Sequence, residues 1–427
     1  MKRSHSLRDD VTALYLVQGV GYMLPLFLVP VLARRLGPDT WGRLALAQTL
    51  IVYLAGVIEF GFQFSATREA ARLRHDPLAL TNLFAGVMAS KIVLASGTAL
   101  LLPLFGTYVV SSHLGTGLLW ASWAAATAQS LSLFWFYQGL ELVRRAALLE
   151  MGGRILSTAL CLQWVRHPAD IWLVPSLQAM SSMLVMALEA HGLRGTVTWR
   201  WPRSRAIVSA LREGRSLFVF RTAINLYAVC NVFVLSCFAP LRLVAFYAGP
   251  ERLAKAVVSL LQPISQALFP RSSYLAAADP PAATRLGRKA LWAMGGLGLV
   301  AGTVLHWGAS LIIRLAFGPG FEPAVAVLRW LALLSPLIAI NMALAVQFMV
   351  PQGRDAALTR ILLLAGGFNL AAAWWAAPQF GAAGMAITAV LTEALILLAT
   401  VFQLRGPVSQ IGQRTMVHAS APCAEVL

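Results

Sequence analysis

Charged side chains within long apolar segments are the groups in this chain most suited to chemistry. Lys91 falls in the middle of one apolar run, Arg221 falls in a second, and Arg252 and Lys255 fall in a third. A cation at the centre of a bilayer costs about 2.5–3.5 kcal/mol on a lenient insertion scale, so these side chains are expected to face water. Because guanidinium groups bind phosphate oxygens in pairs, the pattern favours a cavity that binds phosphate or diphosphate.

Two of these cations, Arg221 and Lys255, also have a purely structural interpretation. Arg221 and Asn225 are four residues apart on one helical face, but Arg221 can also extend to the membrane surface. Glu251 and Lys255 are four residues apart as well and can neutralise each other, which would leave Arg252 as the net charge. Lys91 is the exception, since extension to the surface is hardest from the middle of a span.

Two of the carboxylates within the apolar segments are interpreted as the acidic counterparts of these cations. Glu59 falls in the outer half of one segment and Glu393 in the middle of another. Either residue can pair with a basic side chain, or it can bind a proton or a sodium ion during transport.

Catalytic motifs are absent from the sequence. It has no GxSxG, HExxH or phosphate-binding loop signature, and its four cysteines form no CxxC pair. We therefore expect neither an enzyme nor a metal or other cofactor.

The composition places these residues in a membrane protein. Apolar residues make up 58% of the 427 residues and charged residues 12%, against about 45–50% and about 25% in soluble proteins. The formal net charge is +17. In a membrane protein, an excess of basic residues is expected to mark the loops on the cytoplasmic side, so no nucleic-acid partner is predicted.

Stretches of about 17–25 mostly apolar residues predict twelve membrane spans. The basic residues between them gather on the side that carries both termini, which predicts cytoplasmic termini. The apolar run after residue 10 is too long for a cleaved signal peptide. The predicted spans are 11–33, 44–64, 82–104, 118–138, 148–165, 171–190, 217–238, 246–269, 290–313, 324–349, 361–377 and 382–404.

An arginine-rich interruption divides the spans into two sets of six. The predicted organisation is an N-terminal six-helix bundle (1–190), a cytoplasmic basic linker (191–216), a C-terminal six-helix bundle (217–405) and a polar cytoplasmic tail (406–427). Two bundles of this kind around a central cavity are typical of a transporter. The predicted fold class is all-α integral membrane.

Short motifs occur in order along nearly the whole chain. The first half contains Pro25-Leu-Phe-Leu-Val-Pro30, Leu36-Gly-Pro-Asp-Thr-Trp-Gly42, Glu59-Phe-Gly-Phe62 and Ser65-Ala-Thr-Arg68. The second half contains Asn225-Leu-Tyr227, Ala245-Phe-Tyr-Ala-Gly249, Gln262-Pro263 and Phe317-Gly-Pro-Gly-Phe-Glu-Pro323. Together they closely resemble the Wzx-type polysaccharide biosynthesis flippases of the multidrug/oligosaccharidyl-lipid/polysaccharide exporter superfamily.

The resemblance implies a flippase for undecaprenyl-diphosphate-linked oligosaccharide repeat units of O-antigen or exopolysaccharide. Such a protein moves its substrate from the inner to the outer leaflet of the cell inner membrane by alternating access, coupled to an ion gradient. It implies no chemical conversion, and its expected partners are the lipid-linked substrate, membrane lipid, a polysaccharide polymerase and a chain-length regulator. The predicted substrate-binding residues are Arg68, Lys91, Arg221, Asn225, Arg252 and Lys255, and the predicted ion-coupling residues are Glu59 and Glu393.

Two alternatives remain open from the sequence. A drug or cation antiporter of the same superfamily would need a net acidic, aromatic cavity, and the excess of cations over acids within the spans only mildly opposes this. A membrane polymerase or ligase for the same polysaccharide would generally need a large external loop with catalytic groups, and no long external loop is predicted.

Overall fold

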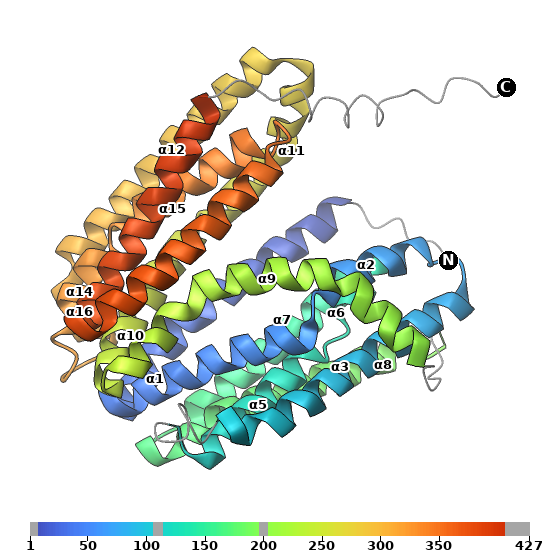
Figure 1. The fold of residues 1–427 in the computed structure, drawn as a ribbon, viewed down its shortest axis with the longest axis horizontal. Helices are drawn as coiled ribbons and strands as arrows, with labels where there is room; N and C mark the ends of the chain where they lie inside the picture. The colour runs from blue at the N-terminus through green and yellow to red at the C-terminus, as the bar shows by residue number, and fades with distance from the viewer. Residues whose placement is uncertain (1–6, 106–113, 196–203, 406–427) are drawn as a thin grey trace.

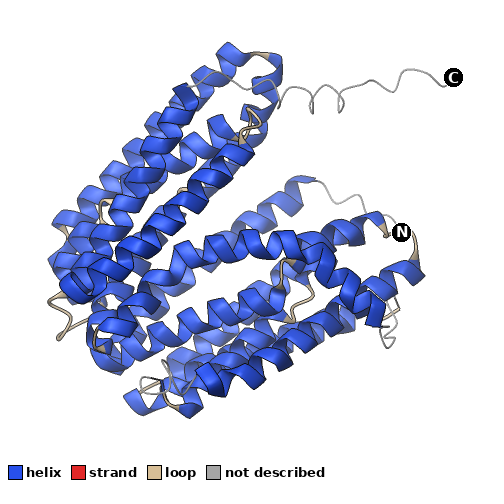
Figure 2. Cartoon of the chain, in the orientation of Figure 1, coloured by secondary structure: helices blue, strands red, loops and turns tan. Residues whose placement is uncertain are grey.

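The computed structural model describes residues 7–105, 114–195 and 204–405, and the elements within these ranges are helices and short turns (Figure 2). The side chains at 7–20, 22–23, 25–26, 216 and 220–228 are not described. The predicted polar tail, 406–427, and residues 196–203 of the predicted linker lie outside the described residues.

The helices form two lobes that meet at one end and separate toward the other, so that the molecule is shaped like a V (Figure 1). The first turn of α1 and the last turn of α16 lie on the open side of the V. The N lobe contains α1 (Leu7–Glu59), α2 (Phe62–Arg72), α3 (Pro77–Phe105), α5 (Thr116–Ser130), α6 (Phe134–Gly139), α7 (Val143–Trp164), the 3₁₀ turn η2 (Pro168–Trp172) and α8 (Leu173–Gly192).

The long helix α9 (Ser204–Phe238) contacts α2, α3 and α1 of the N lobe and also α16, so it joins the two lobes. It begins inside the segment predicted as the linker. The C lobe contains α10 (Leu241–Ser259), α11 (Gln262–Ala278), α12 (Pro280–Trp307), α13 (Ala309–Ala316), α14 (Ala324–Leu331), α15 (Leu334–Leu344), the π-helical turn η3 (Ala345–Met349) and α16 (Asp355–Arg405).

Six helical segments in the described part of the chain are long and apolar enough to cross a membrane. Two of them, Phe27–Arg72 and Asp355–Arg405, have 46 and 51 residues, whereas one crossing needs about 20. Each contains a glycine with a left-handed backbone, Gly37 at φ 71° and Gly381 at φ 53°, where the helix axis changes direction. Since glycine adopts this conformation without steric cost, one long helical segment can cross the membrane twice.

Large apolar side chains are exposed on the surface of the molecule. Trp292, Trp307, Leu364 and Phe402 are each more than 70% exposed. Large apolar side chains exposed in such numbers are expected on a surface whose solvent is hydrocarbon.

Several of the predicted continuous spans are interrupted in the structure, among them 44–64 at Phe60 and Gly61, 290–313 at Gly308, and 324–349 at Ala332 and Leu333. The span predicted at 118–138 is divided into α5 and α6 at Leu131–Leu133, and the span predicted at 246–269 is divided into α10 and α11 at Leu260 and Leu261. Pro263 in the first turn of α11 has no backbone N–H and so favours a helix start there. Broken helices at membrane depth need polar partners or a wet cavity to satisfy the freed backbone groups.

Small residues allow the two lobes to meet closely at the base of the V. A Cβ atom at Gly42 of α1 would stand 1.9 Å from the carbonyl oxygen of Leu241 at the start of α10. A Cβ atom at Gly249 of α10 would stand 2.6 Å from the ring of Phe317, and Trp41 packs edge-on against the same ring with 6.4 Å between centroids. Gly42 and Gly249, each at the end of a short motif that also contains an aromatic residue, therefore serve packing at the junction of the lobes.

Two arginines beside this junction bind helix ends. Arg34 Nε donates to the carbonyl oxygen of Ala316 at the end of α13, at 3.2 Å. Arg35 donates to the carbonyl oxygens of Leu162 and Val165 at the end of α7, the latter at 2.8 Å. Cations complement the partial negative charge and free carbonyls of helix C-termini, which accounts for basic residues on the side predicted to carry few.

Candidate functional site

A polar cavity with a volume of about 1120 Å³ lies where the N lobe faces α10 of the C lobe. Its wall is formed by residues of α1, α2, α5, α6, α7, α8 and α10. The volume slightly exceeds the range of about 300–1,000 Å³ usual for small-molecule pockets, so a bulky polar head group fits better than a small ion.

Three cations line the described part of this cavity: Arg154 from α7, and Arg252 and Lys255 from α10. The guanidinium carbon of Arg252 lies 5.3 Å from the ring centroid of Trp41, within the distance at which a cation is attracted to an aromatic face. A Cβ atom at Gly21 would stand 3.0 Å from a guanidinium nitrogen of Arg154. The glycine therefore leaves room for this side chain beside α1.

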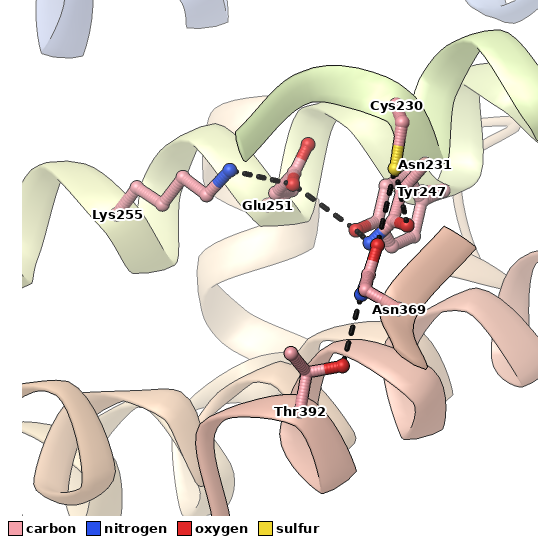
Figure 3. Close-up of polar contacts among 7 residues, drawn as sticks. All are labelled: Cys230, Asn231, Tyr247, Glu251, Lys255, Asn369 and Thr392. Atoms are coloured by element: carbon pink, nitrogen blue, oxygen red, sulfur yellow. Dashed lines mark hydrogen bonds and ion pairs between the residues drawn. The ribbon is translucent and has the colours of Figure 1, made fainter. Parts of the chain in front are cut away.

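Lys255 is held by a buried carboxylate. Its Nζ lies 2.8 Å from Glu251 Oε1, and the hydroxyl of Tyr247 donates to the same oxygen at 3.0 Å (Figure 3). The lysine side chain is 44% exposed and the glutamate side chain 9% exposed. The pairing predicted for this i,i+4 pair is therefore present, but it leaves the lysine on the cavity wall.

The same polar chain continues across the C lobe to α16. Asn231 Nδ2 donates to the Tyr247 hydroxyl at 3.0 Å, and the neighbouring Cys230 thiol lies 3.1 Å from Asn369 Oδ1. Asn369 Nδ2 donates in turn to Thr392 Oγ1 at 3.0 Å. Figure 3 shows these side chains in one file, which connects the cavity wall on α10 with α9 and both halves of α16.

The cavity wall also carries carboxylates. Glu59 at the end of α1 and Glu150 in α7 both line it. Glu150 Oε1 accepts a hydrogen bond from Ser132 Oγ at 2.7 Å. Three cations therefore face two carboxylates in the lining that the structure describes, a mixed field with a small positive excess.

Uncharged amides and hydroxyls make up much of the remaining polar lining. Amide groups both donate and accept hydrogen bonds, as sugar hydroxyls do, and they are suited to a neutral saccharide. Sequence reasoning did not identify these residues or Arg154 as site residues. The lining amides and hydroxyls are Gln48, Gln63, Gln129, Ser130, Ser132, Ser157, Thr158, Gln178, Ser181, Ser182 and Ser259.

The structure brings three of the predicted site residues to the cavity, namely Arg252, Lys255 and Glu59. Lys91 is outside the lining: it is 1% exposed, and its Nζ donates to the carbonyl oxygen of Ser130 at 2.6 Å, directly behind the wall. Arg68 is exposed on α2 and also lies outside the lining.

The remaining predicted residues lie elsewhere. Glu393 is in the C lobe, where its Oε2 accepts a hydrogen bond from Asn341 Nδ2 at 2.8 Å. Arg221 and Asn225 belong to the helical backbone of α9, but their side chains lie outside the described residues. Within the described residues no group of histidine, cysteine and acidic side chains is arranged to hold a metal ion.

Comparison of sequences finds two relatives that match nearly end to end. A protein named "Putative O-antigen transporter" from Escherichia coli (strain K12) is 28% identical over 396 residues, which cover 92% of this chain and 95% of the relative. A protein of the same name from Shigella dysenteriae is 25% identical over 394 residues, covering 92% and 98% of the two chains.

Comparison of structures finds the same architecture in transporters of low sequence identity. The lipid II flippase MurJ in an inward closed conformation has a TM-score of 0.73 at 12% identity, covering 96% of this chain and 90% of that one. An inward-facing multidrug resistance MATE family transporter of the MOP superfamily has a TM-score of 0.67 at 13% identity, covering 95% and 96%. These likenesses confirm the predicted fold class, an all-α integral membrane protein with about twelve transmembrane helices in two bundles around a central cavity.

The predicted family is confirmed by sequence as well. Residues 7–276 match the profile of the family described as polysaccharide biosynthesis protein. This match covers more than half of the chain and includes the whole N lobe and α10, which supply the cavity wall. The chain is therefore a multi-pass membrane protein that belongs to the polysaccharide biosynthesis protein family.

Proposed function

We propose that this protein is a flippase that moves undecaprenyl-diphosphate-linked oligosaccharide repeat units from the cytoplasmic to the outer leaflet of the inner membrane. The repeat units would serve surface polysaccharide assembly, as the names of the two sequence relatives suggest. The protein would act by alternating access and without chemical conversion. A repeat-unit polymerase and a chain-length regulator are its proposed partners.

The observation that carries this proposal is the chemistry of the cavity wall. Arg154 and Arg252 supply guanidinium groups that can bind the oxygens of a diphosphate, and Lys255 adds an ammonium group. The amide and hydroxyl lining suits the attached sugars. The prenyl chain would remain in the lipid, since burying it in a polar cavity would forfeit its hydrophobic contact with the bilayer.

The shape of the molecule supports loading from the cytoplasm. The lobes separate on the side of the first turn of α1 and the last turn of α16 (Figure 1). The basic residues between the predicted spans gather on that same side, which favours a cytoplasmic location. The V would then be open to the inner leaflet, where lipid-linked sugars are assembled.

Energy for directional movement would come from an ion gradient. Glu59 on the cavity wall and Glu393 in the C lobe are the proposed carriers of the coupling cation. Arg68, Lys91, Arg221 and Asn225 remain proposed substrate contacts for another stage of the cycle, because the two lobes must rearrange when the cavity turns outward.

Reconstitution tests the proposal directly. Purified protein in liposomes should transfer a lipid-linked oligosaccharide between leaflets, measured as loss of access by an external sugar-modifying reagent. Arg252→Ala should slow the transfer, whereas Arg288→Ala, which removes an exposed cation from α12, should not. The proposal would be contradicted if liposomes that contain the unmodified protein transferred the substrate no faster than protein-free liposomes.

A drug or cation antiporter is the second candidate, and the carboxylates of Glu59 and Glu150 on the cavity wall favour it. Efflux of a cationic dye from cells that express the protein distinguishes the two functions. An antiporter would lose dye efflux in Glu59→Gln and Glu150→Gln and retain it in Arg252→Ala. A flippase would lose glycan export in Arg252→Ala, and cells that express the unmodified protein would show no more dye efflux than cells without it.

A further inference from the structure

We propose that Glu150 and Glu189, joined by the hydroxyl of Ser132, form a site in the N lobe that holds one proton and exchanges it with the cavity. The three residues come from α7, α8 and the break between α5 and α6. The proton site itself requires no assumption about the substrate, whereas its coupling to transport rests on the proposed function.

The geometry places a single hydroxyl between two carboxyl groups. Ser132 Oγ lies 2.7 Å from Glu150 Oε1 and 3.5 Å from Glu189 Oε2. A serine hydroxyl has one proton and can donate it fully to only one of two acceptors. The shorter contact assigns that proton to Glu150, so the longer contact to Glu189 is favourable when the Glu189 carboxyl is itself protonated.

Glu189 is buried in a way that disfavours its charged form. The residue is 0% exposed, and its Oε2 accepts the backbone N–H of Leu133 at 2.8 Å at the helix break. Its other oxygen, Oε1, is buried and has no hydrogen-bond partner among the described atoms. A buried carboxylate with an unsatisfied oxygen is costly, and protonation removes most of that cost.

The charges around Glu150 and Glu189 favour a state in which the two carboxyl groups together hold one proton. Lys91 of α3 is the buried cation behind this wall and acts electrostatically on both Glu59 and Glu189. Arg154 follows Glu150 by one turn on α7 and lines the same cavity. The hydroxyl of Tyr137 is committed to the main-chain oxygen of Glu189 at 2.7 Å and does not reach its carboxyl group through that bond.

These neighbours balance two of the three carboxylates. Lys91 and Arg154 together offset two negative charges, while Glu59, Glu150 and Glu189 would carry three if all were ionised. Two carboxyl groups within reach of one hydroxyl share a proton more readily than they accept a second full charge. The proton balance is as follows: a hydronium ion in the cavity protonates Glu150 and leaves as water, and Glu150 then gives its proton to Ser132 Oγ while the serine hydroxyl gives its own proton to Glu189. Glu150 returns to its ionised state, Ser132 to a neutral hydroxyl, and Glu189 holds the proton.

Infrared titration of the purified protein in lipid vesicles, without any substrate, tests the site. A carboxylic-acid C=O band should be present at neutral pH, should vanish as pH rises, and should be absent from Glu189→Gln. Glu150→Gln should shift the pH at which the band vanishes. The control Glu69→Gln, which changes a partly exposed carboxylate of α2 that pairs with Arg72, should leave the band unchanged.

Three results would overturn the proposal. The first is a neutral-pH spectrum that is the same in Glu189→Gln and the unmodified protein. The second is a band that persists in both glutamine variants. The third is a spectral change that follows added sodium at constant pH, which would assign the site to a metal cation. The glutamine side chain can still accept the Leu133 N–H, so Glu189→Gln is expected to fold.

A separate measurement examines coupling to transport. In liposomes with an imposed pH difference, Glu189→Gln should reduce the dependence of transfer rate on that difference while retaining basal transfer, since Glu59 and Glu393 are unchanged. If the band behaves as expected but no lipid-linked sugar is transferred by the unmodified protein, the flippase proposal fails and the proton site stands.

Discussion

The ammonium group of Lys255 lies 2.8 Å from Glu251 Oε1, and the two partners differ sharply in burial, with 44% of the lysine side chain and 9% of the glutamate side chain exposed. The glutamate also accepts from Tyr247, which links it to the polar chain that reaches α16. The pair therefore links the water-accessible cavity wall to the buried interior of the C lobe. Substitution of its two members should change the stability of the protein by different amounts.

Removal of the lysine should be more damaging than neutralisation of the glutamate. Lys255→Met leaves a buried carboxylate with a hydroxyl but no cation, at a cost of about 1–3 kcal/mol. Glu251→Gln leaves an ammonium group that water in the cavity can solvate, so the decrease in the free energy of unfolding should be smaller. Thermal unfolding in detergent compares the two, and equal losses would show that Lys255 is buried as deeply as its partner in solution.

The junction between the lobes should not tolerate a methyl group at Gly42. A Cβ atom there would stand 1.9 Å from the Leu241 carbonyl oxygen, so Gly42→Ala must push α1 and α10 apart. Overpacking of this kind typically costs about 1–3 kcal/mol. Gly97→Ala in α3 is the matched control, because its Cβ would meet nothing within 4 Å and should be neutral or stabilising. Melting temperatures of the two variants check this prediction.

The two cavity arginines should be needed for transfer of a diphosphate-linked substrate. A hydrogen bond to a charged group contributes about 1.5–3 kcal/mol, so Arg154→Ala or Arg252→Ala should slow transfer about tenfold to a hundredfold. Arg252→Lys should restore little, because lysine lacks the planar group that stacks over Trp41 and binds two oxygens at once. Initial rates in liposomes measure this, and full activity of Arg252→Lys would show that charge alone suffices.

Arg35 should stabilise the end of α7. Its guanidinium group donates to the carbonyl oxygens of Leu162 and Val165, which the helix itself leaves unpaired. Arg35→Ala should lower the free energy of unfolding by about 1–2 kcal/mol. Arg43→Ala removes an exposed cation from the same region and should have a much smaller effect. Unchanged melting of Arg35→Ala would show that solvent satisfies these carbonyls equally well.

The membrane location, the helical class and the family could all be predicted from the sequence. Composition and span length depend only on which residues are present, and the ordered motifs are contiguous in the chain. Arg252 and Lys255 were identified as site residues because a cation within an apolar run must find water or a partner wherever the helix lies.

The tertiary structure alone decided which faces of the helices surround the cavity. In a soluble helix, polar periodicity marks the exposed face, but here one face contacts lipid and the other contacts neighbouring helices, and both are apolar. The sequence therefore could not show that Lys91 lies behind the wall or that Arg154 lies on it. Likewise, Glu150 and Glu189 are 39 positions apart in the chain and meet at Ser132 only because α5 breaks there and α7 packs against α8.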